Sequence, residues 1–336
     1  MPAITEYLTG LLHRKQPETS PPITTSTAIF LLVLYTLLYV IPFYLSSKTR
    51  PSPRLSRDAV SVIRARITSV SITCALTSLT TLGVLTRVGG YEASQALHAL
   101  GYWPLGLVGA SRALLLTALL FLGPLYELLI VEDGWRAWAR LEPVRTVFVD
   151  WSAWRNYVMG PLTEELLFRS AAIPLMLLAR TPLNQTIFLS PLVFGLAHVH
   201  HLYEFRVTHR GVPMLAAVLR SAFQLSYTTL FGAYATFLYL RTGSLVAVFA
   251  VHALCNCMGL PRVWGAVVGR TRRMRTRVVR QGGGNDETVE EVIEVETEVG
   301  KVWTIAYYVL LVVGAGLWYR GLWSLTESGN ALVSFE

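Results

Sequence analysis

IFLLVLYTLLYVIPFYL, residues Ile29–Leu45, contains no Asp, Glu, Lys or Arg. Because the hydrocarbon core of a bilayer is about 30 Å thick, about 20 such residues in a helix can cross it. The rest of the 336-residue chain has the same character, with 53% hydrophobic residues, 15% charged residues and a mean hydropathy of +0.46. Soluble domains carry roughly 25% charged residues. The composition therefore excludes an ordinary water-soluble enzyme and indicates an integral membrane protein.

Further apolar stretches follow along the chain, and together they predict an all-α bundle with about eight transmembrane helices. The segments are Ile29–Leu45, Ile67–Leu85, Ala113–Val131, Pro161–Ala179, Leu183–His200, Met214–Leu240, Ser244–Leu260 and Trp303–Leu322. We expect residues 1–336 to form a single polytopic membrane domain, in which residues 150–260 hold the motifs that carry chemistry.

Positive charge is concentrated in the loops that follow the first, third, fifth and seventh segments. Excess Lys and Arg mark cytosolic loops, so these loops are predicted to face the cytosol and both termini the opposite side. The net charge of +8 therefore indicates membrane topology and contact with the lipid bilayer, and not a nucleic-acid partner. Residues 262–300, a basic run followed by an acidic one, are expected to be a charged cytosolic loop or a loose hairpin. A basic strip lying on the anionic leaflet is the alternative.

The fourth segment begins with GPLTEELLFR, residues 160–169. Proline at the first helical position favours a helix start at Gly160. Glu165 and Arg169 are four residues apart and can pair on one helix face, which leaves Glu164 without that partner. Ionisable residues at membrane depth are costly and suggest a functional site. The alternative is a helix start with a structural salt bridge.

Two later segments add polar side chains. His198 lies near the end of the fifth segment, and His252 and Asn256 lie four residues apart on one face of the seventh. A purely structural role, in which each side chain makes hydrogen bonds between helices, is the alternative. The predicted topology, however, puts Glu164 and these three side chains in one layer near the cytosolic surface.

A glutamate and two histidines fit two chemistries. In a zinc site they are ligands, with an open position for water. In a metal-free site a Glu and a His activate water, while a second His and an Asn amide stabilise the oxyanion. The zinc-hydrolase signature HExxH is absent, and Asn256 is a poor zinc ligand but a good hydrogen-bond donor. We therefore favour a site without a cofactor, with zinc as the alternative.

The ordered motifs resemble those of the type II CAAX prenyl endopeptidases, the Ras- and a-factor-converting proteases of the CAAX protease and bacteriocin-processing family. The matching residues are Arg155, Asn156, Gly160, Pro161, Glu164, Glu165, Phe168, Arg169 and Ser170, then Phe194, Ala197 and His198, then His252 and Asn256. The resemblance implies a glutamate-type intramembrane endopeptidase with eight helices in the endoplasmic reticulum membrane. Its implied substrates are farnesylated or geranylgeranylated CAAX proteins, such as Ras-like GTPases or a mating pheromone, from which it removes the last three residues.

The same resemblance implies a role for each motif residue. Glu164 and His198 would activate the water, and His252 and Asn256 would form the oxyanion site. Glu165 and Arg169 would complete the first motif. A non-enzymatic membrane chaperone or scaffold for prenylated proteins is the alternative from another functional class, and release of a tripeptide product would distinguish the two.

Overall fold

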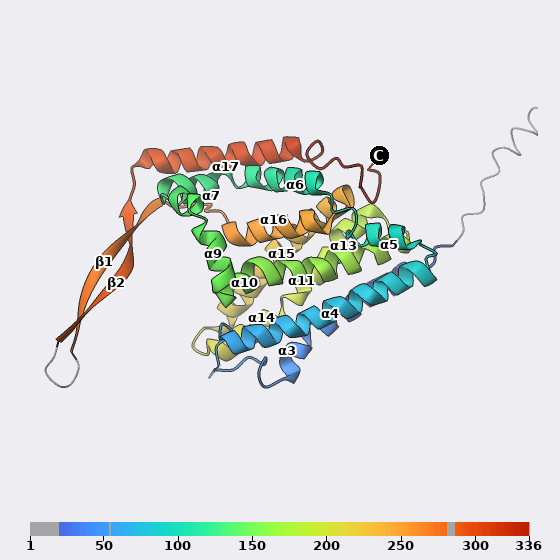
Figure 1. The fold of residues 1–336 in the computed structure, drawn as a ribbon, viewed down its shortest axis with the longest axis horizontal. Coiled ribbons are helices and arrows are strands. Elements are labelled where there is room, and N and C mark those ends of the chain that lie inside the picture. The colour runs from blue at the N-terminus through green and yellow to red at the C-terminus, as the bar shows by residue number, and fades with distance from the viewer. Residues whose placement is uncertain (1–19, 54, 281–285, 336) are drawn as a thin grey trace, which may run out of the picture.

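The computed structural model describes residues 20–53, 55–280 and 286–335, and these form a helical bundle with one projecting hairpin (Figure 1). The first half contains α2 (Thr25–Val40), α3 (Pro42–Leu45), α4 (Val60–Arg87), α5 (Ala93–Ala99), α6 (Leu107–Leu120), α7 (Leu122–Tyr126), the π-helical turn η1 (Glu127–Val131), α8 (Trp135–Ala139), α9 (Glu142–Val149) and α10 (Trp151–Trp154). The second half contains the π-helical turn η2 (Arg155–Met159), α11 (Gly160–Glu165), the π-helical turn η3 (Leu166–Ala171), α12 (Ile173–Leu178), α13 (Leu183–Ala197), α14 (His200–Thr208), α15 (Met214–Thr242), α16 (Leu245–Met258), β1 (Val268–Arg280), β2 (Asp286–Glu298) and α17 (Lys301–Gly321). The predicted helical class is confirmed.

Within the described residues, three helical stretches are long and apolar enough to cross a membrane: Thr25–Leu45, Val60–Arg87 and Lys301–Gly321. A fourth candidate is the pair Leu107–Leu120 and Leu122–Val131, which is bent by 80°. The third predicted segment is therefore not one straight span. Pro124 explains the break, because a proline ring clashes with the carbonyl four residues earlier and cannot donate the helical hydrogen bond.

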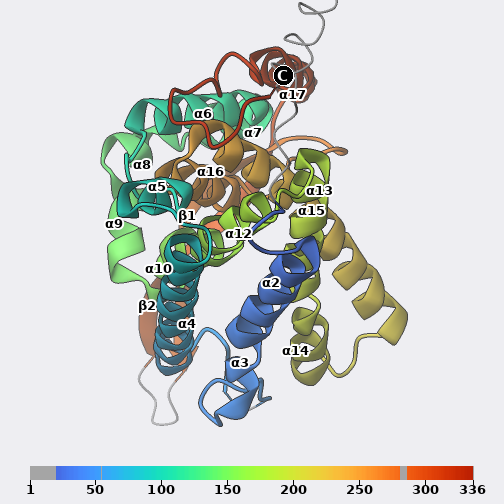
Figure 2. The same ribbon diagram turned by 90° about the vertical axis from the view of Figure 1, so that its right-hand side faces the viewer.

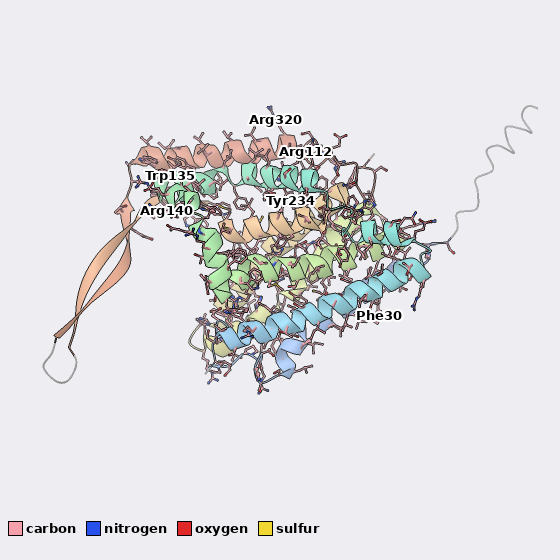
Figure 3. The ribbon with its side chains drawn as sticks, in the orientation of Figure 1. Phe30, Arg112, Trp135, Arg140, Tyr234 and Arg320 are labelled. Carbon is pink, nitrogen blue, oxygen red and sulfur yellow. The ribbon has the colours of Figure 1, made fainter. Side chains whose placement is uncertain are left out.

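The outside of the bundle is apolar, as expected of a surface that faces lipid. Phe30 on α2 is 64% exposed and Leu230 on α15 is 73% exposed. Tyr234 instead lies between helices, whereas Arg320 points away from α17 at the bundle surface (Figure 3). The Tyr234 hydroxyl is 2.9 Å from that of Thr117 on α6. Such hydrogen bonds satisfy polar groups that have no water to bind.

The fourth predicted segment lies at the centre of the bundle, where α12 is surrounded by other helices in the end-on view (Figure 2). Leu167, Ala171 and Leu175 are fully buried. The segment is not one regular α-helix, because η3 interrupts it between α11 and α12. The predicted helix start at Gly160 is also wrong, since helical turns run on from Trp151. The turn η2 just before Pro161 supplies the extra residue that accommodates a proline inside a helix.

The charged region at residues 262–300 contains the only sheet in the part of the chain that the structure describes. Its two strands pair antiparallel from Val268 opposite Glu298 to Arg280 opposite Asp286. The glycines at the predicted hairpin turn lie outside the described residues. The N-terminus, predicted to face away from the cytosol, also lies outside them. Over residues 293–298, β-branched residues alternate with glutamates, and this period of two favours a strand over a helix. The hairpin projects from one end of the bundle near α9, whereas α5 and the C-terminus lie at the other end (Figure 1).

Candidate active site

A buried ionic network joins α11, η3 and α16. Oε1 of Glu165 is 3.1 Å from Nη1 of Arg169 and 2.7 Å from Nδ1 of His252. The Glu165 and Arg169 side chains are 0% and 1% exposed. The predicted pairing of Glu165 with Arg169 is confirmed, whereas the contact with His252 was missed. It joins residues 87 positions apart in sequence, and helical periodicity carries no signal for such a contact.

Arg169 is held by more than its carboxylate partner. Its Nη2 donates to the carbonyl of Gly232 on α15 over 3.2 Å. Its guanidinium also lies 4.6 Å from the ring centroid of Phe194 on α13. A buried guanidinium needs such partners, because an uncompensated charge in an apolar interior is strongly destabilising. Arg169 therefore fixes the positions of three helices around the site.

Glu164 lies near two histidines, and it approaches the Nε2 side of His252 whereas Glu165 bonds Nδ1. Oε2 of Glu164 is 3.9 Å from Nε2 of His198 and 3.9 Å from Nε2 of His252. These distances are too long for direct hydrogen bonds but suit groups that act through one water molecule. The carboxylate is 22% exposed, so water can reach it. The structure thus brings Glu164, His198 and His252 together, as the predicted topology required.

Hydrogen bonds fix which nitrogen of each histidine faces Glu164. Nδ1 of His198 lies 2.8 Å from the carbonyl oxygen of Phe194, and Nδ1 of His252 bonds the Glu165 carboxylate. Carbonyl and carboxylate oxygens only accept, so each Nδ1 carries a proton. Nε2 of each ring is then the atom that can exchange a proton at the site. The pattern of a histidine oriented by a carboxylate recurs in hydrolytic enzymes.

Asn256 lies one turn after His252 on α16, as predicted. Its side chain is exposed, and Nδ2 donates to the backbone carbonyl of Asn156 on η2 over 3.0 Å. An amide NH₂ has two donor hydrogens, so one N–H remains for another acceptor. Asn156, whose carbonyl orients this amide, was not among the predicted site residues.

Two cavities meet at these side chains. One has a volume of about 600 Å³ and is lined mainly by apolar side chains from α13, α15, α16 and α17, including Phe194, Phe231 and Trp318. The other has a volume of about 200 Å³ and lies beside α3, α4 and η2, with several arginines in its wall. Glu164, His198 and Asn256 line both cavities, and His252 lines the apolar one. The candidate catalytic groups therefore border both cavities. We call the first the apolar cavity and the second, whose lining mixes arginines and histidines with apolar side chains, the polar cavity.

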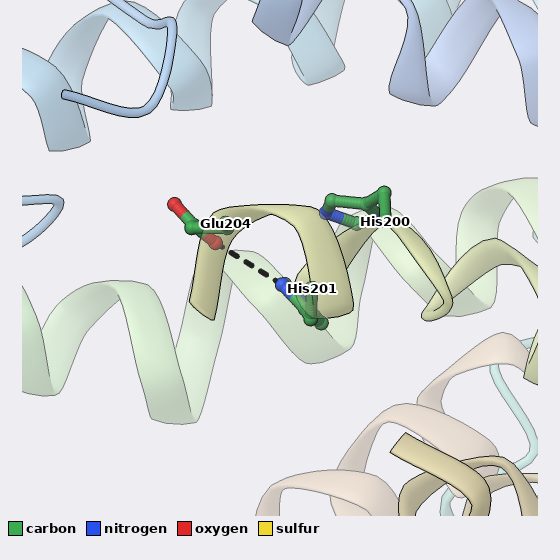
Figure 4. A group of neighbouring side chains, drawn as sticks. All are labelled: His200, His201 and Glu204. Atoms are coloured by element: carbon green, nitrogen blue, oxygen red, sulfur yellow. Dashed lines mark hydrogen bonds and ion pairs between the residues drawn. The ribbon is translucent and has the colours of Figure 1, made fainter. Parts of the chain in front are cut away.

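A different cluster has the closest metal-ligand geometry among the side chains that the structure describes. It comprises His200, His201 and Glu204, whose ligand atoms lie within 4.8 Å of one another (Figure 4). Glu204 is already engaged, because its Oε2 is 3.2 Å from Nδ1 of His201 and its Oε1 is 2.8 Å from Nη2 of Arg66. A cation would have to displace or repel that guanidinium. This set is not the Glu164, His198 and His252 set that the zinc alternative requires.

Acidic and imidazole side chains enclosed by apolar helices, with water access on one side, are the features of an intramembrane protease. Residues 146–258 match the family model described as type II CAAX prenyl endopeptidase, Rce1-like. The chain is 34% identical to the Probable CAAX prenyl protease 2 of Schizosaccharomyces pombe over 88% of its length and 92% of that protein. It is 36% identical to CAAX prenyl protease 2 of Arabidopsis thaliana, covering 71% of this chain and 81% of that one, and 39% identical to the Homo sapiens protein, covering 65% and 68%. The chain therefore belongs to the type II CAAX prenyl endopeptidase family. No solved structure matches it.

Proposed function

We propose that this protein is an endopeptidase that removes the last three residues from prenylated CAAX proteins, with a metal-free mechanism. The observation that carries the proposal is the position of Glu164, whose Oε2 is 3.9 Å from Nε2 of both His198 and His252 at the junction of the two cavities. The relatives named CAAX prenyl protease 2 support the reaction. A scaffold that only binds prenylated tails would not need a water-activating group there.

Water activation falls to Glu164 and His198. The Glu164 carboxylate and the unprotonated Nε2 of His198 are both acceptors, and a water molecule has two O–H donors. A water held by both presents its remaining lone pair to the scissile carbonyl carbon. As the C–O bond forms, Glu164 takes one proton as general base. When the C–N bond breaks, that proton passes to the leaving amine. The second water proton, left on the new carboxyl group, is lost through Nε2 of His198, so the step releases a tripeptide and a carboxylate.

The oxyanion that forms during attack needs donors on its other side. For His252 to donate through Nε2 its ring must carry both protons, because Nδ1 already donates to Glu165. The resulting imidazolium would lie between the carboxylates of Glu164 and Glu165, and these two acids together would balance His252 and Arg169. The second donor is the free N–H of Asn256. Donors placed where charge develops stabilise the transition state more than the substrate.

The apolar cavity would hold the prenyl chain. Its volume of about 600 Å³ lies within the range of small-molecule sites. Burial of a hydrocarbon chain contributes roughly 0.8 kcal/mol per CH₂ group. Farnesylated or geranylgeranylated CAAX proteins, including Ras-like GTPases and mating pheromones, present such a chain directly beside the scissile bond. Binding of the prenyl chain in this cavity would place the carbonyl group of the prenylated cysteine beside Glu164.

The proposed setting is the endoplasmic reticulum membrane, with eight transmembrane segments and the site facing the cytosol. The lipid of a prenylated tail lies in the cytosolic leaflet, so its scissile bond is reached from that side. Reporter tags at the C-terminus and in the β1–β2 hairpin should read opposite sides, the hairpin being cytosolic. A cytosolic C-terminus would contradict this orientation.

The proposed reaction is tested with purified full-length protein and a farnesylated CAAX peptide, with and without a metal chelator. We expect release of an intact tripeptide at an unchanged rate in chelator. The same peptide without the prenyl group is the control and should be cleaved poorly. Binding of the prenylated peptide without any tripeptide release would instead support the scaffold function.

A further inference from the structure

The polar cavity of about 200 Å³ has a basic wall beside the candidate catalytic groups. Arg57, which precedes α4, Arg66 on α4 and Arg155 on η2 all line it, as do Glu164 and His198. A cavity that joins arginines to a water-activating carboxylate fits a peptide segment with an anionic end. The three guanidinium groups differ in how closely they are paired with carboxylates.

Two of the three arginines are engaged in the structure. Arg66 donates to the carbonyl of Thr49 through Nε and Nη2, at 3.2 and 2.9 Å, and pairs with Glu204 at 2.8 Å. Nη1 of Arg155 lies 2.8 Å from Oδ1 of Asp58. These contacts hold the chain that precedes α4 against the bundle. Arg66 and Arg155 are therefore positioning residues for that segment.

Arg57 is the third guanidinium, and its ion pairs are the longest of the three. Its nearest described anionic atoms are Oε2 of Glu204 at 3.6 Å and Oδ1 of Asp58 at 3.8 Å, both beyond hydrogen-bond distance. Each of those carboxylates has a closer partner: Glu204 pairs with Arg66, and Asp58 pairs with Arg155. Glu164 also lines the cavity, so three carboxylates match the three arginines in number, but Arg57 is the arginine with the longest ion pairs. The Arg57 side chain is 46% exposed, so it is accessible to a ligand.

We propose that Arg57 binds the C-terminal carboxylate of the substrate and so makes the enzyme select for a chain end three residues beyond the scissile bond. This inference rests on the proposed function. Three extended residues span at most about 10–11 Å, so a carboxylate bound at Arg57 would fix where the chain end lies relative to the scissile bond. The planar fork of an arginine matches both oxygens of a carboxylate.

The test compares three prenylated peptides of the same sequence: the free acid, the C-terminal carboxamide, and the acid extended by one residue. Full-length protein in zwitterionic micelles is assayed for tripeptide or tetrapeptide release as kcat/KM. Because charge-assisted hydrogen bonds are strong, we expect the wild type to prefer the acid over the carboxamide roughly tenfold to a hundredfold. The extended acid should also be poor, since its carboxylate is displaced by one residue.

Arg57→Gln should bring the acid-to-carboxamide ratio towards one, and Arg57→Lys should retain part of the preference. Arg64→Gln is the matched control, because Arg64 lies on α4 near Trp151 and does not line the cavity; its ratio should equal that of the wild type. Equal cleavage of acid and carboxamide by the wild type, or an unchanged ratio in Arg57→Gln, would overturn the inference and leave the proposed function standing. An Arg57→Gln effect seen only with anionic lipid, and equal for both peptides, would assign Arg57 to lipid headgroups and also overturn it. Release from no peptide at all would overturn the proposed function and this inference with it.

Discussion

The carboxylate of Glu165 accepts a hydrogen bond from Nδ1 of His252 across 2.7 Å, between the fourth and seventh predicted segments. The two adjacent acids therefore have different surroundings. Glu165 is buried among Arg169 and His252, and Glu164 is partly exposed to the cavities. The proposed division of work follows from that difference: Glu164 handles the proton of the water, and Glu165 orients and balances a histidine.

Replacing Glu164 with glutamine should reduce kcat by roughly 10²- to 10⁴-fold with little change in KM, because a general base contributes about that much. Single-turnover release of the tripeptide from a farnesylated peptide measures the effect. Glu142→Gln is the matched control, since Glu142 pairs only with an exposed arginine on the neighbouring segment. Near-normal turnover in Glu164→Gln would end the assignment of the base.

Loss of Arg169 should lower stability, because Glu165 would keep its charge in an apolar interior without its guanidinium partner. Breaking a buried pair in this way typically costs about 3–5 kcal/mol. Arg169→Met should therefore show a clearly lower Tm in detergent than Arg140→Met, a control at a position whose side chain is 72% exposed.

A double replacement separates the structural from the positioning role of this network. Glu165→Leu with Arg169→Met should regain much of the Tm, since an apolar pair can substitute for a buried ion pair. Turnover should stay low, because His252 would have lost the carboxylate that orients it. A double variant with restored turnover would contradict the role of Glu165 in positioning His252.

Asn256→Ala should reduce kcat by roughly 10²- to 10³-fold, the usual effect of removing one oxyanion donor, with little change in KM. Cys257→Ala, at the next position of α16, is the control and should be close to the wild type. His198→Ala should be more severe, because it disturbs the activation of water.

Metal analysis of the same variants tests the zinc alternative, which predicts one equivalent of zinc lost together with activity in both His198→Ala and His252→Ala.

Acid should weaken the contacts that anchor α14. Burial alone would raise the pKa of Glu204, but the hydrogen bond with His201 and the ion pairs with Arg66 and Arg57 together hold that pKa below its usual value. A carboxyl group with a depressed pKa in the folded state stabilises the fold above its unfolded pKa, about 4.3, and loses that contribution as the pH falls through the folded value.

The Tm difference between the wild type and Glu204→Gln should therefore be largest near pH 7 and shrink below about pH 4. Thermal unfolding in detergent across this range measures it, and Glu142→Gln again serves as the control. A difference that stays constant from pH 7 to well below pH 4 would contradict the stabilising role of the ionised Glu204.

Local spacing predicted those parts of the site that depend on one helix alone. Glu165 and Arg169, four residues apart, do pair, and His252 and Asn256 lie on successive turns of α16. The charge distribution predicted that Glu164 and the histidines share one layer. Contacts made by packing were beyond sequence reasoning, since the bond from His252 to Glu165 and the arginines of the polar cavity depend on how helices far apart in sequence meet.

Backbone irregularities were also missed. A proline after a glycine suggested a helix start, yet η2 carries the helix through Pro161 without a break. The hairpin β1–β2 was predicted only as one of the options for a charged loop. The sequence has a local preference in both cases, but one extra residue in a helical turn changes the first outcome, and the pairing of two strands decides the second.

The candidate catalytic groups border both the apolar and the polar cavity, and this position would favour the forward direction of the proposed reaction. Cleavage would form the prenyl-cysteine carboxylate on the apolar side and the free amine of a small, doubly charged tripeptide on the polar side. One product dissolves in lipid and the other in water, so they leave for different phases. Resynthesis of the peptide bond requires both products to bind at the active site at the same time. Because one product is diluted into lipid and the other into water, that encounter is rare. The partition of the products would thus make maturation irreversible without any input of chemical energy beyond hydrolysis itself.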